Sequence, residues 1–530
     1  MVGITNRHAL WKELSGTQTQ WDMIIVGGGI TGAGILREAA RIGLKALLIE
    51  QKDYAWGTSS RSSKMVHGGL RYIAQGDIKL TKHSVEERER LIREAPGLVD
   101  RLGYLFTIRK GQFPGKIAFN TLLKVYDGLA GTKTQDYFDK KALLKKIPGL
   151  NEKGLKGASY YTDAATDDAR LTLRVLQEAI EAGGRSGNYL QGETLLKDAQ
   201  GKVTGITIKD MESGETTDVN ANVVINATGA WVDKLRSQVI NEHKIRPLRG
   251  SHIILPHSKA PVTDSLTLFH PKDKRPVFVF PWEGATVIGT TDLDHKDDLM
   301  KEPSISQEEL NYLLEITQFE FPEANIADAD IISTYAGVRP VISSGSSKDP
   351  SKEKREHAVW SDKGLISVSG GKLTTFRLIA LDVIKAAKIS LGIKDTTPTS
   401  NHVIRPTTIN TNDVAPTDLP WSTRLIGRYG DNAKAMFNDV EDEEKGKIDN
   451  TLFCLAELRW AARHESVIHL DDLLLRRSRL GSLLPNGGEN LMPRLEPICK
   501  QELNWDDKTW QAEKERYLAI WKSCYSLPTA

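Results

Sequence analysis

The sequence of 530 residues predicts an α/β fold with three parts, which are an N-terminal strand–helix–strand domain, a β-rich domain and a C-terminal helical domain. Three observations support this prediction. A glycine-rich turn joins an apolar strand to a helix within residues 23–50, β-type segments fill residues 246–334, and residues 421–530 show mostly helical patterns. With 39% hydrophobic and 26% charged residues, the composition is that of a globular chain long enough for two or three domains.

The glycine-rich turn has the pattern G-x-G-x-x-G, formed by Gly27, Gly29 and Gly32. It follows the apolar segment 23–26 and opens an alanine-rich helix, after which a second strand ends at Glu50. In this Rossmann-like arrangement the glycines let the backbone approach a pyrophosphate at the helix N-terminus, and the carboxylate binds a ribose. Glycine clusters also form ordinary turns, but here the strand, the helix and the acid all stand where a dinucleotide site requires them.

Three later segments would bring small or hydroxyl-bearing residues to the same ligand. The loop 57–64 is rich in serine, an apolar strand stops at Ala227, Thr228 and Gly229, and a second glycine-rich helix start occupies residues 370–375. Open α/β sheets bind their ligands at such strand ends. Because G-x-G-x-x-G occurs once in the chain, we expect a single dinucleotide and electrons that enter from an oxidised substrate.

Charge and cysteine content argue against several other classes. The net charge of +2 does not favour nucleic acid as a partner. The three cysteines lie without metal-ligand spacing, which predicts a reducing compartment and no metal site. The first residues lack the apolar stretch of a signal peptide, and no run of about 18 apolar residues predicts a membrane span.

Eight segments carry a resemblance to a known family. They are TSSRSSKMVHGGLRY (58–72), DDARL (167–171), NATGAW (226–231), RGSHI (249–253), FVFPW (278–282), IGTTD (288–292), YAGVRP (335–340) and GGKLTT (370–375). In this order they resemble the aerobic FAD-dependent glycerol-3-phosphate dehydrogenases, within the superfamily of D-amino-acid oxidase and glycine oxidase. The C-terminal region is similar to that family's helical domain through ELRWAARHES (457–466) and DLLLRRSR (472–479).

We therefore expect a Rossmann-like FAD-binding domain, a β-rich substrate-binding domain and a C-terminal helical domain. The FAD-binding domain takes residues 21–95, 155–245 and 335–395, and the substrate-binding domain takes residues 96–154 and 246–334. Residues 1–20 form an N-terminal surface arm that extends past the family's usual start, residues 396–420 form a linker, and residues 421–530 form the helical domain.

The cofactor implied by the resemblance is FAD, held by the glycine-rich turns, the serine-rich loop with the segment after it, and the strand ends. The expected contacts are Gly27, Gly29, Ile30, Thr31, Gly32, Glu50, Thr58, Ser59, Ser60, Ser63, His67, Gly68, Gly69, Leu70, Ala227, Thr228, Gly229, Gly371, Lys372, Leu373 and Thr374.

A phosphorylated alcohol carries about two negative charges near neutral pH, so its site needs converging cations. The resemblance implies a substrate pocket formed by Arg71, Tyr72, His252, Arg339, Arg355 and Lys372. For four of them a structural or solvent-exposed role is an alternative. Arg71 could be a solvated turn arginine, Arg339 a core ion pair and His252 a buried structural histidine. Arg355 stands in a charge run, where Lys354 or a solvated face is an equal alternative.

Oxidation of a secondary alcohol removes a hydride from carbon and a proton from the hydroxyl, so a base with a pKa near the working pH is required. Histidine meets this requirement without perturbation, and lysine meets it where neighbouring cations lower its pKa. We expect His252 to be the base and Lys372 with Arg339 to polarise the hydroxyl, although the three roles could be exchanged.

The resemblance implies oxidation of sn-glycerol 3-phosphate to dihydroxyacetone phosphate, with electrons passed to a membrane quinone from an enzyme peripheral to the cytoplasmic face of the cell membrane. One rival is an oxidase that reduces oxygen to hydrogen peroxide. A second is an amino-acid oxidase, which the positively charged pocket residues disfavour because its substrate is an amine. A third is a flavin-binding sensor without turnover. A homodimer is compatible with the sequence.

Residues 111–131 combine apolar side chains such as Phe113 and Ile117 with Lys116 and Lys124. Two interpretations stay open. The segment is either a helix packed on its neighbours or a basic amphipathic surface that enters anionic lipid.

Overall fold

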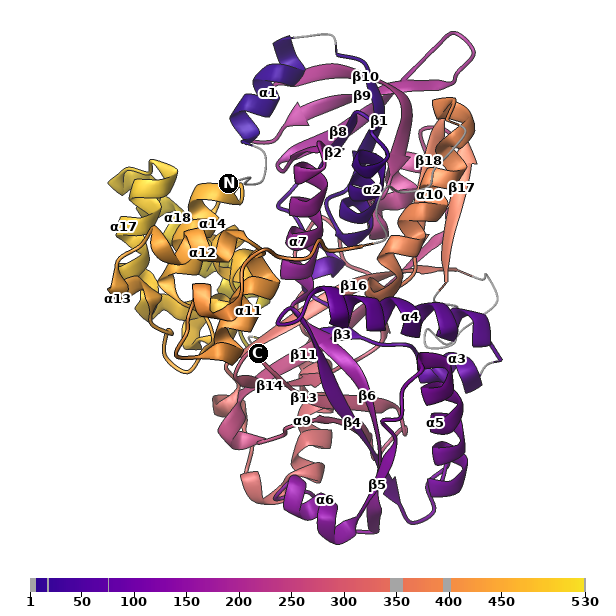
Figure 1. Cartoon of the computed structure of the whole chain (residues 1–530), viewed down its shortest axis with the longest axis vertical. Coiled ribbons are helices and arrows are strands. Elements are labelled where there is room, and N and C mark those ends of the chain that lie inside the picture. Colours follow the sequence, from indigo (N-terminus) through magenta and orange to yellow (C-terminus); the bar gives the residue numbers. More distant parts are fainter. Residues whose placement is uncertain (1–5, 17–18, 75, 344–355, 394–401, 529–530) are drawn as a thin grey trace.

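The computed structural model describes residues 6–16, 19–74, 76–343, 356–393 and 402–528. Two β-sheets lie one above the other in Figure 1, and a group of C-terminal helices lies beside the place where they meet. The predicted fold class, a Rossmann-like domain with a β-rich domain and a helical C-terminal region, is confirmed.

The first sheet has the parallel centre of a Rossmann-like domain. Its main path is β17-β18-β10-β1-β2-β7, and β9 and β8 extend it from β10 as an antiparallel layer. The strands are β1 Trp21–Val26, β2 Ala46–Ile49, β7 Arg185–Gly187, β8 Leu190–Lys197, β9 Val203–Asp210, β10 Thr216–Asn226, β17 His357–Asp362 and β18 Leu365–Gly370. The central strands are apolar runs because both faces of the sheet are covered.

Three helices cover one face of this sheet, namely α2 (Ile30–Arg41), α7 (Asp168–Glu181) and α10 (Phe376–Leu391). Their apolar side chains share one core with β1, β2, β10 and β18. The carboxyl ends of the central strands point toward the second sheet, which lies below the first in Figure 1.

The other face holds a helix from the predicted N-terminal arm, α1 (Arg7–Gly16). Leu10 and Leu14 are buried in a core with residues of β1, β2 and β8 to β10. The Arg7 guanidinium is buried as well, and it donates to the Asp210 carboxylate and to the Asn188 carbonyl. The arm is thus a docked part of the domain instead of a surface extension, because its apolar face and Arg7 both find buried partners.

The second sheet has ten strands. Its main path is β15-β11-β14-β13-β12-β4-β6-β3, with β16 on β11 and β5 on β6. The strands are β3 Met65–Val66, β4 Val99–Arg109, β5 Asp136–Asp139, β6 Leu155–Thr166, β11 Ile245–Pro256, β12 Ser265–Phe269, β13 Pro276–Trp282, β14 Ala285–Gly289, β15 Leu293–Asp294 and β16 Ser333–Ile342. Strands β13 and β14 form a hairpin, and α9 (Gln307–Glu320) packs on one face of the sheet.

Two strands lie in a different domain from the one that the sequence predicted. We assigned residues 155–245 and 335–395 to the FAD-binding domain, yet β6 pairs with β4 and β16 pairs with β11, both in the second sheet. The short β3 also joins this sheet by pairing with β6. Strand patterns show that a segment is β but not which strand it pairs with, which explains the displaced boundaries.

Helix α5 (Lys116–Ala130), together with Phe113 just before it, shows both features that the sequence left open. Phe119, Leu123 and Tyr126 are buried against the second sheet, while Phe113 and Ile117 are 89% and 84% exposed. The neighbouring helices are α3 Leu70–Ala74, α4 Ile78–Glu94 and α6 Lys140–Lys146. Within the described part of the chain, no helix has the length and apolar character that crossing a bilayer would need.

The C-terminal region is helical and shares a core with the second sheet. Its helices are α11 Leu419–Tyr429, α12 Asn432–Asn438, α13 Asp442–Lys445, α14 Leu455–His464, α15 Leu470–Asp472, α16 Leu480–Leu483, α17 Met492–Leu503 and α18 Asp507–Cys524. A π-helical turn at Leu473–Arg477 lies between α15 and α16. The predicted linker 396–420 is described from residue 402, and up to α11 it contains only one short helical turn, Thr411–Asp413.

His469 joins the C-terminal helices to the first sheet. Its Nδ1 lies 2.9 Å from Glu513 Oε1 on α18, and its Nε2 lies 3.4 Å from Glu212 Oε1 in the turn before β10. Burial alone would lower the pKa of His469, but the hydrogen bonds to the two glutamates raise it to about 10. This pKa is above that of an unfolded histidine, which is about 6.5. The interactions of protonated His469 with the two glutamates therefore stabilise the fold fully below pH 6.5, and this stabilisation is lost as the pH rises toward 10.

We therefore expect His469→Gln to lower the free energy of unfolding at pH 6 by on the order of 2 kcal/mol and by much less at pH 10. Denaturant unfolding at both pH values measures this difference. His8→Gln is the control, because His8 is exposed on α1. An effect of His469→Gln that stays constant across this range would contradict the assignment.

Candidate active site

The G-x-G-x-x-G turn connects β1 to α2, which begins at Ile30. A Cβ atom on Gly32 would lie 1.8 Å from the Gly27 carbonyl oxygen, so the first turn of the helix packs directly on the loop. Gly27 has φ of +118°, and a Cβ there would lie 2.5 Å from the Ala227 carbonyl oxygen. Only glycine fits at these two positions, which leaves the backbone exposed to a ligand at the helix N-terminus.

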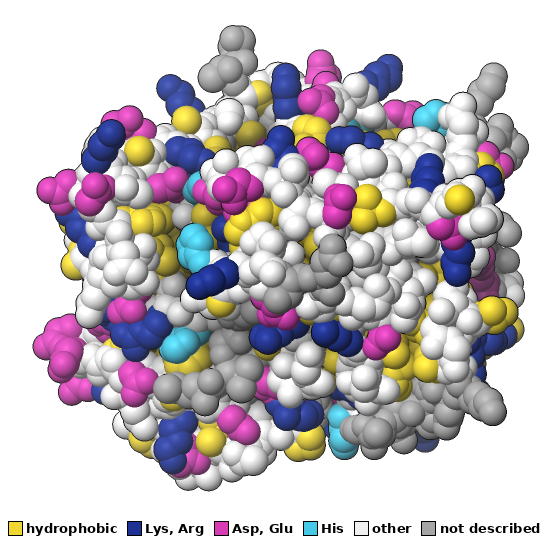
Figure 2. Space-filling view, turned by 90° about the horizontal axis from the view of Figure 1, so that it is seen from above, with side chains coloured by type: hydrophobic (Ala, Val, Ile, Leu, Met, Phe, Trp, Pro, Cys, Tyr) yellow, Lys and Arg dark blue, Asp and Glu magenta, His cyan; other side chains and the backbone are white. Residues whose placement is uncertain are grey.

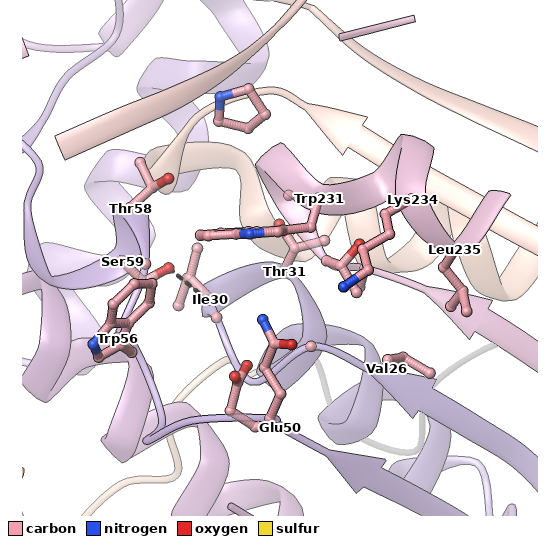
Figure 3. Close-up of a pocket in the computed structure, with 18 of the residues that line it drawn as sticks. Val26, Ile30, Thr31, Glu50, Trp56, Thr58, Ser59, Trp231, Lys234 and Leu235 are labelled. Carbon is pink, nitrogen blue, oxygen red and sulfur yellow. Dashed lines mark hydrogen bonds between the residues drawn. The ribbon is translucent and has the colours of Figure 1, made fainter. Parts of the chain in front are cut away.

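A cavity follows the carboxyl ends of β1, β2 and β10 and continues to the helix start after β18 (Figure 3). Thirteen of the residues expected to contact FAD line it. They are Gly27, Gly29, Ile30, Thr31, Glu50, Thr58, Ser59, Ala227, Thr228, Gly229, Gly371, Lys372 and Leu373. Four segments that are distant in the sequence thus meet around one elongated site.

Hydrogen bonds fix the wall around the start of α2. Ser59 Oγ accepts from the Ile30 N–H at 2.9 Å, which ties the serine-rich loop to the helix (Figure 3). Glu50 Oε2 accepts from the Gly28 N–H at 2.7 Å, and its Oε1 accepts from the Lys52 N–H at 2.9 Å. Burial raises the pKa of the Glu50 carboxyl, and these two hydrogen bonds oppose that rise.

Eight other expected FAD contacts are not among the residues that line the cavity. They are Gly32, Ser60, Ser63, His67, Gly68, Gly69, Leu70 and Thr374. Thr374 Oγ1 exchanges hydrogen bonds with the backbone of His67, and the Gly68 N–H donates to Tyr126 Oη at 2.9 Å. Thr374 thus ties the loop before α3 to the helix start after β18.

Several lining residues were missed by the sequence analysis. They are Val26, Gln51, Trp56, Gly57, Ser62, Asp168, Gln191, Gly192, Glu193, Trp231, Lys234, Leu235, Gln238, Pro340 and Gly370. Trp231 lies across the cavity in Figure 3. It ends the family-like segment NATGAW, so the sequence contained a signal that could have identified it as a lining residue. Its buried indole Nε1 has no hydrogen-bond partner among the described residues. The glycine cradle, Glu50 and this donor fit an adenine dinucleotide.

Lys372 lies at the end of the cavity nearest α3. Its Nζ is 3.8 Å from the centre of the Tyr72 ring and 3.3 Å from Ser84 Oγ. A Cβ atom on Gly69 would come within 2.9 Å of the same Nζ. Three residues expected near the substrate or the flavin are therefore brought together here. Arg71 belongs to α3, but its side chain is outside the described part of the structure, and Arg355 lies outside the described residues altogether.

His252 lies on β11, opposite Tyr335 of β16, and is 1% exposed. Its ring stacks on the Tyr335 ring with centres 4.5 Å apart, and its Nε2 is hydrogen-bonded to Ser63 Oγ at 2.9 Å. Its Nδ1 is buried without a partner among the described residues. Burial, reinforced by the charges of Arg339 and Lys64, lowers the pKa of His252 well below its ordinary value.

Arg339 lies on β16, next to Pro340, which lines the cavity. Its guanidinium donates to Asp292 Oδ1 at 3.2 Å and to Thr290 Oγ1 at 3.0 Å. The sequence left a core ion pair open as an alternative for this arginine, and the structure shows an ion pair with Asp292. Its side chain is 24% exposed, so this ion pair does not bury it in the core.

Fold and site together define a Rossmann-like protein with a site that fits an adenine dinucleotide. The family model for FAD dependent oxidoreductases matches residues 22–377, and the model for the C-terminal domain of alpha-glycerophosphate oxidase matches residues 403–510. The aerobic glycerol-3-phosphate dehydrogenase of Staphylococcus haemolyticus is 35% identical over 498 residues, 89% of each chain, and that of Staphylococcus epidermidis is 36% identical over 485 residues, 87% of each.

Among solved structures, the glycerol-3-phosphate dehydrogenase from Bacillus halodurans complexed with FAD has a TM-score of 0.79 at 27% identity, over 99% of this chain and 98% of that one. The L-alpha-glycerophosphate oxidase from Mycoplasma pneumoniae, at 17% identity and a TM-score of 0.56 over 73% of this chain and 98% of that one, shares the fold. The chain belongs to the FAD-dependent oxidoreductases and, within them, to the family of the aerobic glycerol-3-phosphate dehydrogenases. Its cofactor is FAD.

Proposed function

We propose that this enzyme oxidises sn-glycerol 3-phosphate to dihydroxyacetone phosphate and passes the electrons to a membrane quinone. The observation that carries the reaction is the position of Lys372, which lies on the cavity wall at the end that approaches Tyr72. A cation there suits an alcohol that bears a phosphate, and it does not suit the ammonium group of an amino acid. The relatives named for glycerol 3-phosphate support the same substrate.

The chain's own residues would divide the work as follows. The backbone at Gly27 and Gly29 would hold the pyrophosphate of FAD at the start of α2, and Glu50 would bind the ribose. Bound FAD supplies the acceptor for the hydride. Lys372 and Arg339 would polarise the C2 hydroxyl, Arg71 and Arg355 would bind the phosphate, and Tyr72 would line the pocket.

His252 would take the hydroxyl proton. Its Nδ1 has no partner among the described residues, whereas its Nε2 is bonded to Ser63. A buried N–H without an acceptor costs more than an unused lone pair, so we assign the ring proton to Nε2 and the lone pair to Nδ1. The lowered pKa keeps the imidazole neutral and therefore ready to accept a proton.

Two measurements test this reaction and its rivals. Anaerobic addition of glycerol 3-phosphate should bleach the visible flavin absorbance, and an unchanged spectrum would refute both the reaction and the substrate. A sensor without turnover would fail the same test. Steady-state turnover with a soluble quinone, measured beside peroxide release in air, then separates the proposed dehydrogenase from an oxidase. Peroxide formed in step with substrate consumption, without quinone reduction, would overturn the proposed acceptor.

We further propose that α5 docks the enzyme on the inner face of the cell membrane. Ile117 on α5 and Phe113 just before it are the most exposed large apolar residues of this region, and Lys116 and Lys124 lie exposed on α5. Apolar side chains flanked by lysines insert into the interface of an anionic bilayer. A peripheral position at the membrane would also give the reduced flavin access to quinone.

Ile117→Ser is expected to weaken binding to phosphatidylglycerol vesicles by roughly tenfold, because burial of an isoleucine in lipid contributes about 1.5 kcal/mol or more. Vesicle sedimentation measures the bound fraction. Ile389→Ser on α10 is the matched control, since Ile389 is 94% exposed away from α5 and its loss should leave binding unchanged. Equal effects of the two substitutions would show that α5 is not the docking surface.

A further inference from the structure

We infer that the C-terminal helical domain positions the loop of residues 50–64 and thereby controls how tightly the enzyme holds FAD. Its segment 472–479 reaches the loop from the side opposite the cavity, and its arginines act as positioning residues. This role of the C-terminal domain in FAD binding is independent of which substrate and acceptor the enzyme uses.

The loop has two sides with different neighbours. Seven of its residues line the cavity, and they are Glu50, Gln51, Trp56, Gly57, Thr58, Ser59 and Ser62. Asp53, Ser60 and Arg61 lie between them in the sequence, and their polar atoms bond to the C-terminal domain instead. The contacts of that domain with these three residues therefore set the position of the neighbouring residues that line the cavity.

Asp53 is the first point of attachment. Its carboxylate receives a two-pronged bond from Arg477, at 2.6 and 2.7 Å, and a third bond from Arg476 Nε at 2.5 Å. None of these three side chains is more than 1% exposed. Asp53 stands three residues after Glu50 and three before Trp56, so this ion pair fixes the loop between two residues of the cavity wall.

Arg479 makes the second attachment. It donates to Asp167 and Asp168 at the start of α7, at 2.9 and 2.6 Å, and to the Ser60 carbonyl at 3.2 Å. Asp168 in turn accepts from the backbone and the hydroxyl of Ser62, at 2.9 and 2.7 Å. Arg479 thus holds the loop both directly and through an aspartate that itself lines the cavity.

The end of the chain makes the third attachment. Tyr525, just after α18, lies 3.3 Å from Arg61 Nη2 through its hydroxyl oxygen. The same hydroxyl and the same guanidinium both bond to Glu302. Arg61 is next to Ser62 of the cavity wall. The loop therefore contacts the C-terminal domain at three places, Asp53, Ser60 and Arg61, through residues that follow it in the sequence by more than 400 positions.

Burying these charged side chains costs free energy of folding. Buried arginines lose their hydration, and an apolar contact of equal size would often stabilise the fold at least as well. What an apolar contact lacks is direction, whereas the planar fork of arginine fixes a carboxylate in position and orientation. The network therefore gives the loop one geometry, as a cofactor site requires.

The test is FAD release from the holoenzyme of Arg477→Lys, followed by the fluorescence of free flavin after dilution. Lysine keeps the charge but loses the fork, and we expect release to be faster by about tenfold or more, as for the loss of a hydrogen bond to a charged group. Arg459→Lys is the control, because Arg459 also forms ion pairs with two carboxylates, Glu444 and Glu502, entirely within the C-terminal domain.

We expect the control to lower the melting temperature without changing FAD release by more than about twofold. Equal release from the two variants would overturn the inference, since it would make the network merely structural. If Arg477→Lys does not fold, Arg479→Lys gives the same comparison at the second attachment.

Hydrogen exchange of the unaltered protein provides a test without substitution. Coupling between two sites is reciprocal, so FAD binding must protect the segment 472–479 if this segment holds the FAD loop. We expect slower amide exchange there in the presence of FAD, and no change in α13, which is also in the C-terminal domain. Unchanged exchange in the segment would refute the inference.

Discussion

His252→Asn is expected to lower kcat for glycerol 3-phosphate by roughly 10²- to 10⁴-fold, the usual contribution of a positioned base, with little change in KM. Asparagine is smaller than histidine and can still bond to Ser63, so the sheet around β11 should hold its shape. What would be lost is the neutral nitrogen that we propose as the acceptor of the hydroxyl proton. Steady-state kinetics give kcat and KM, and the anaerobic rate of flavin bleaching isolates the chemical step.

The pH dependence gives a second, independent readout of the same residue. Because burial and the charges of Arg339 and Lys64 lower the pKa of His252, its base form persists below the ordinary range of histidine. The acid limb of the kcat/KM profile should therefore lie below pH 6.5, and Arg339→Gln should move it toward higher pH by removing one of the charges.

A matched control lies on the same sheet. His257 follows β11 and bonds to Thr286 Oγ1, away from the cavity, so His257→Asn should leave kcat and the pH profile unchanged. A rise in KM alone for His252→Asn would make His252 a binding residue and transfer the role of base to Lys372. An acid limb that does not move in Arg339→Gln would place the titrating group elsewhere.

The nucleotide-binding half of the site could be predicted because its signals are local. The glycines of the first turn, the strand before them and Glu50 lie within 28 residues of one another in the sequence. Strand, turn and helix in this order leave little choice of geometry. The structure accordingly places Gly27, Gly29 and Glu50 on one cavity wall.

The other half depends on contacts that leave no local trace. Ser63 stands in a serine-rich loop that predicts cofactor contact, yet it bonds to His252, which is 189 residues away. That contact exists because β11 and β16 place His252 against the loop, and the pairing of these strands could not be read from their apolar patterns.

The C-terminal domain shows the same limit more sharply. The motif DLLLRRSR was recognised as a family segment, but nothing in it names Asp53 or Asp167 as partners. Arginines on a surface helix and arginines buried in a neighbouring domain have the same spacing in a sequence. Burial alone distinguishes them, and burial is set by how the domains pack.

Gly32→Ala is expected to weaken FAD binding by roughly 100-fold or more, since overpacking a rigid backbone contact costs about 3 kcal/mol. The added methyl would stand 1.8 Å from the Gly27 carbonyl oxygen, and the backbone there cannot rotate away as a side chain can. Either α2 or the turn must shift, and both carry the dinucleotide site. The flavin-to-protein absorbance ratio of the purified enzyme and titration with FAD measure the loss.

Gly128→Ala is the matched control, because Gly128 also lies in a helix and a Cβ there meets nothing within 4 Å. That substitution should leave FAD content unchanged and even stabilise α5 slightly, since alanine favours helix over glycine by up to about 1 kcal/mol. Full flavin content in Gly32→Ala would mean that the first turn of α2 can move away from the loop while the cofactor stays bound. The close contact between Gly32 and Gly27 would then not be a requirement of the FAD site.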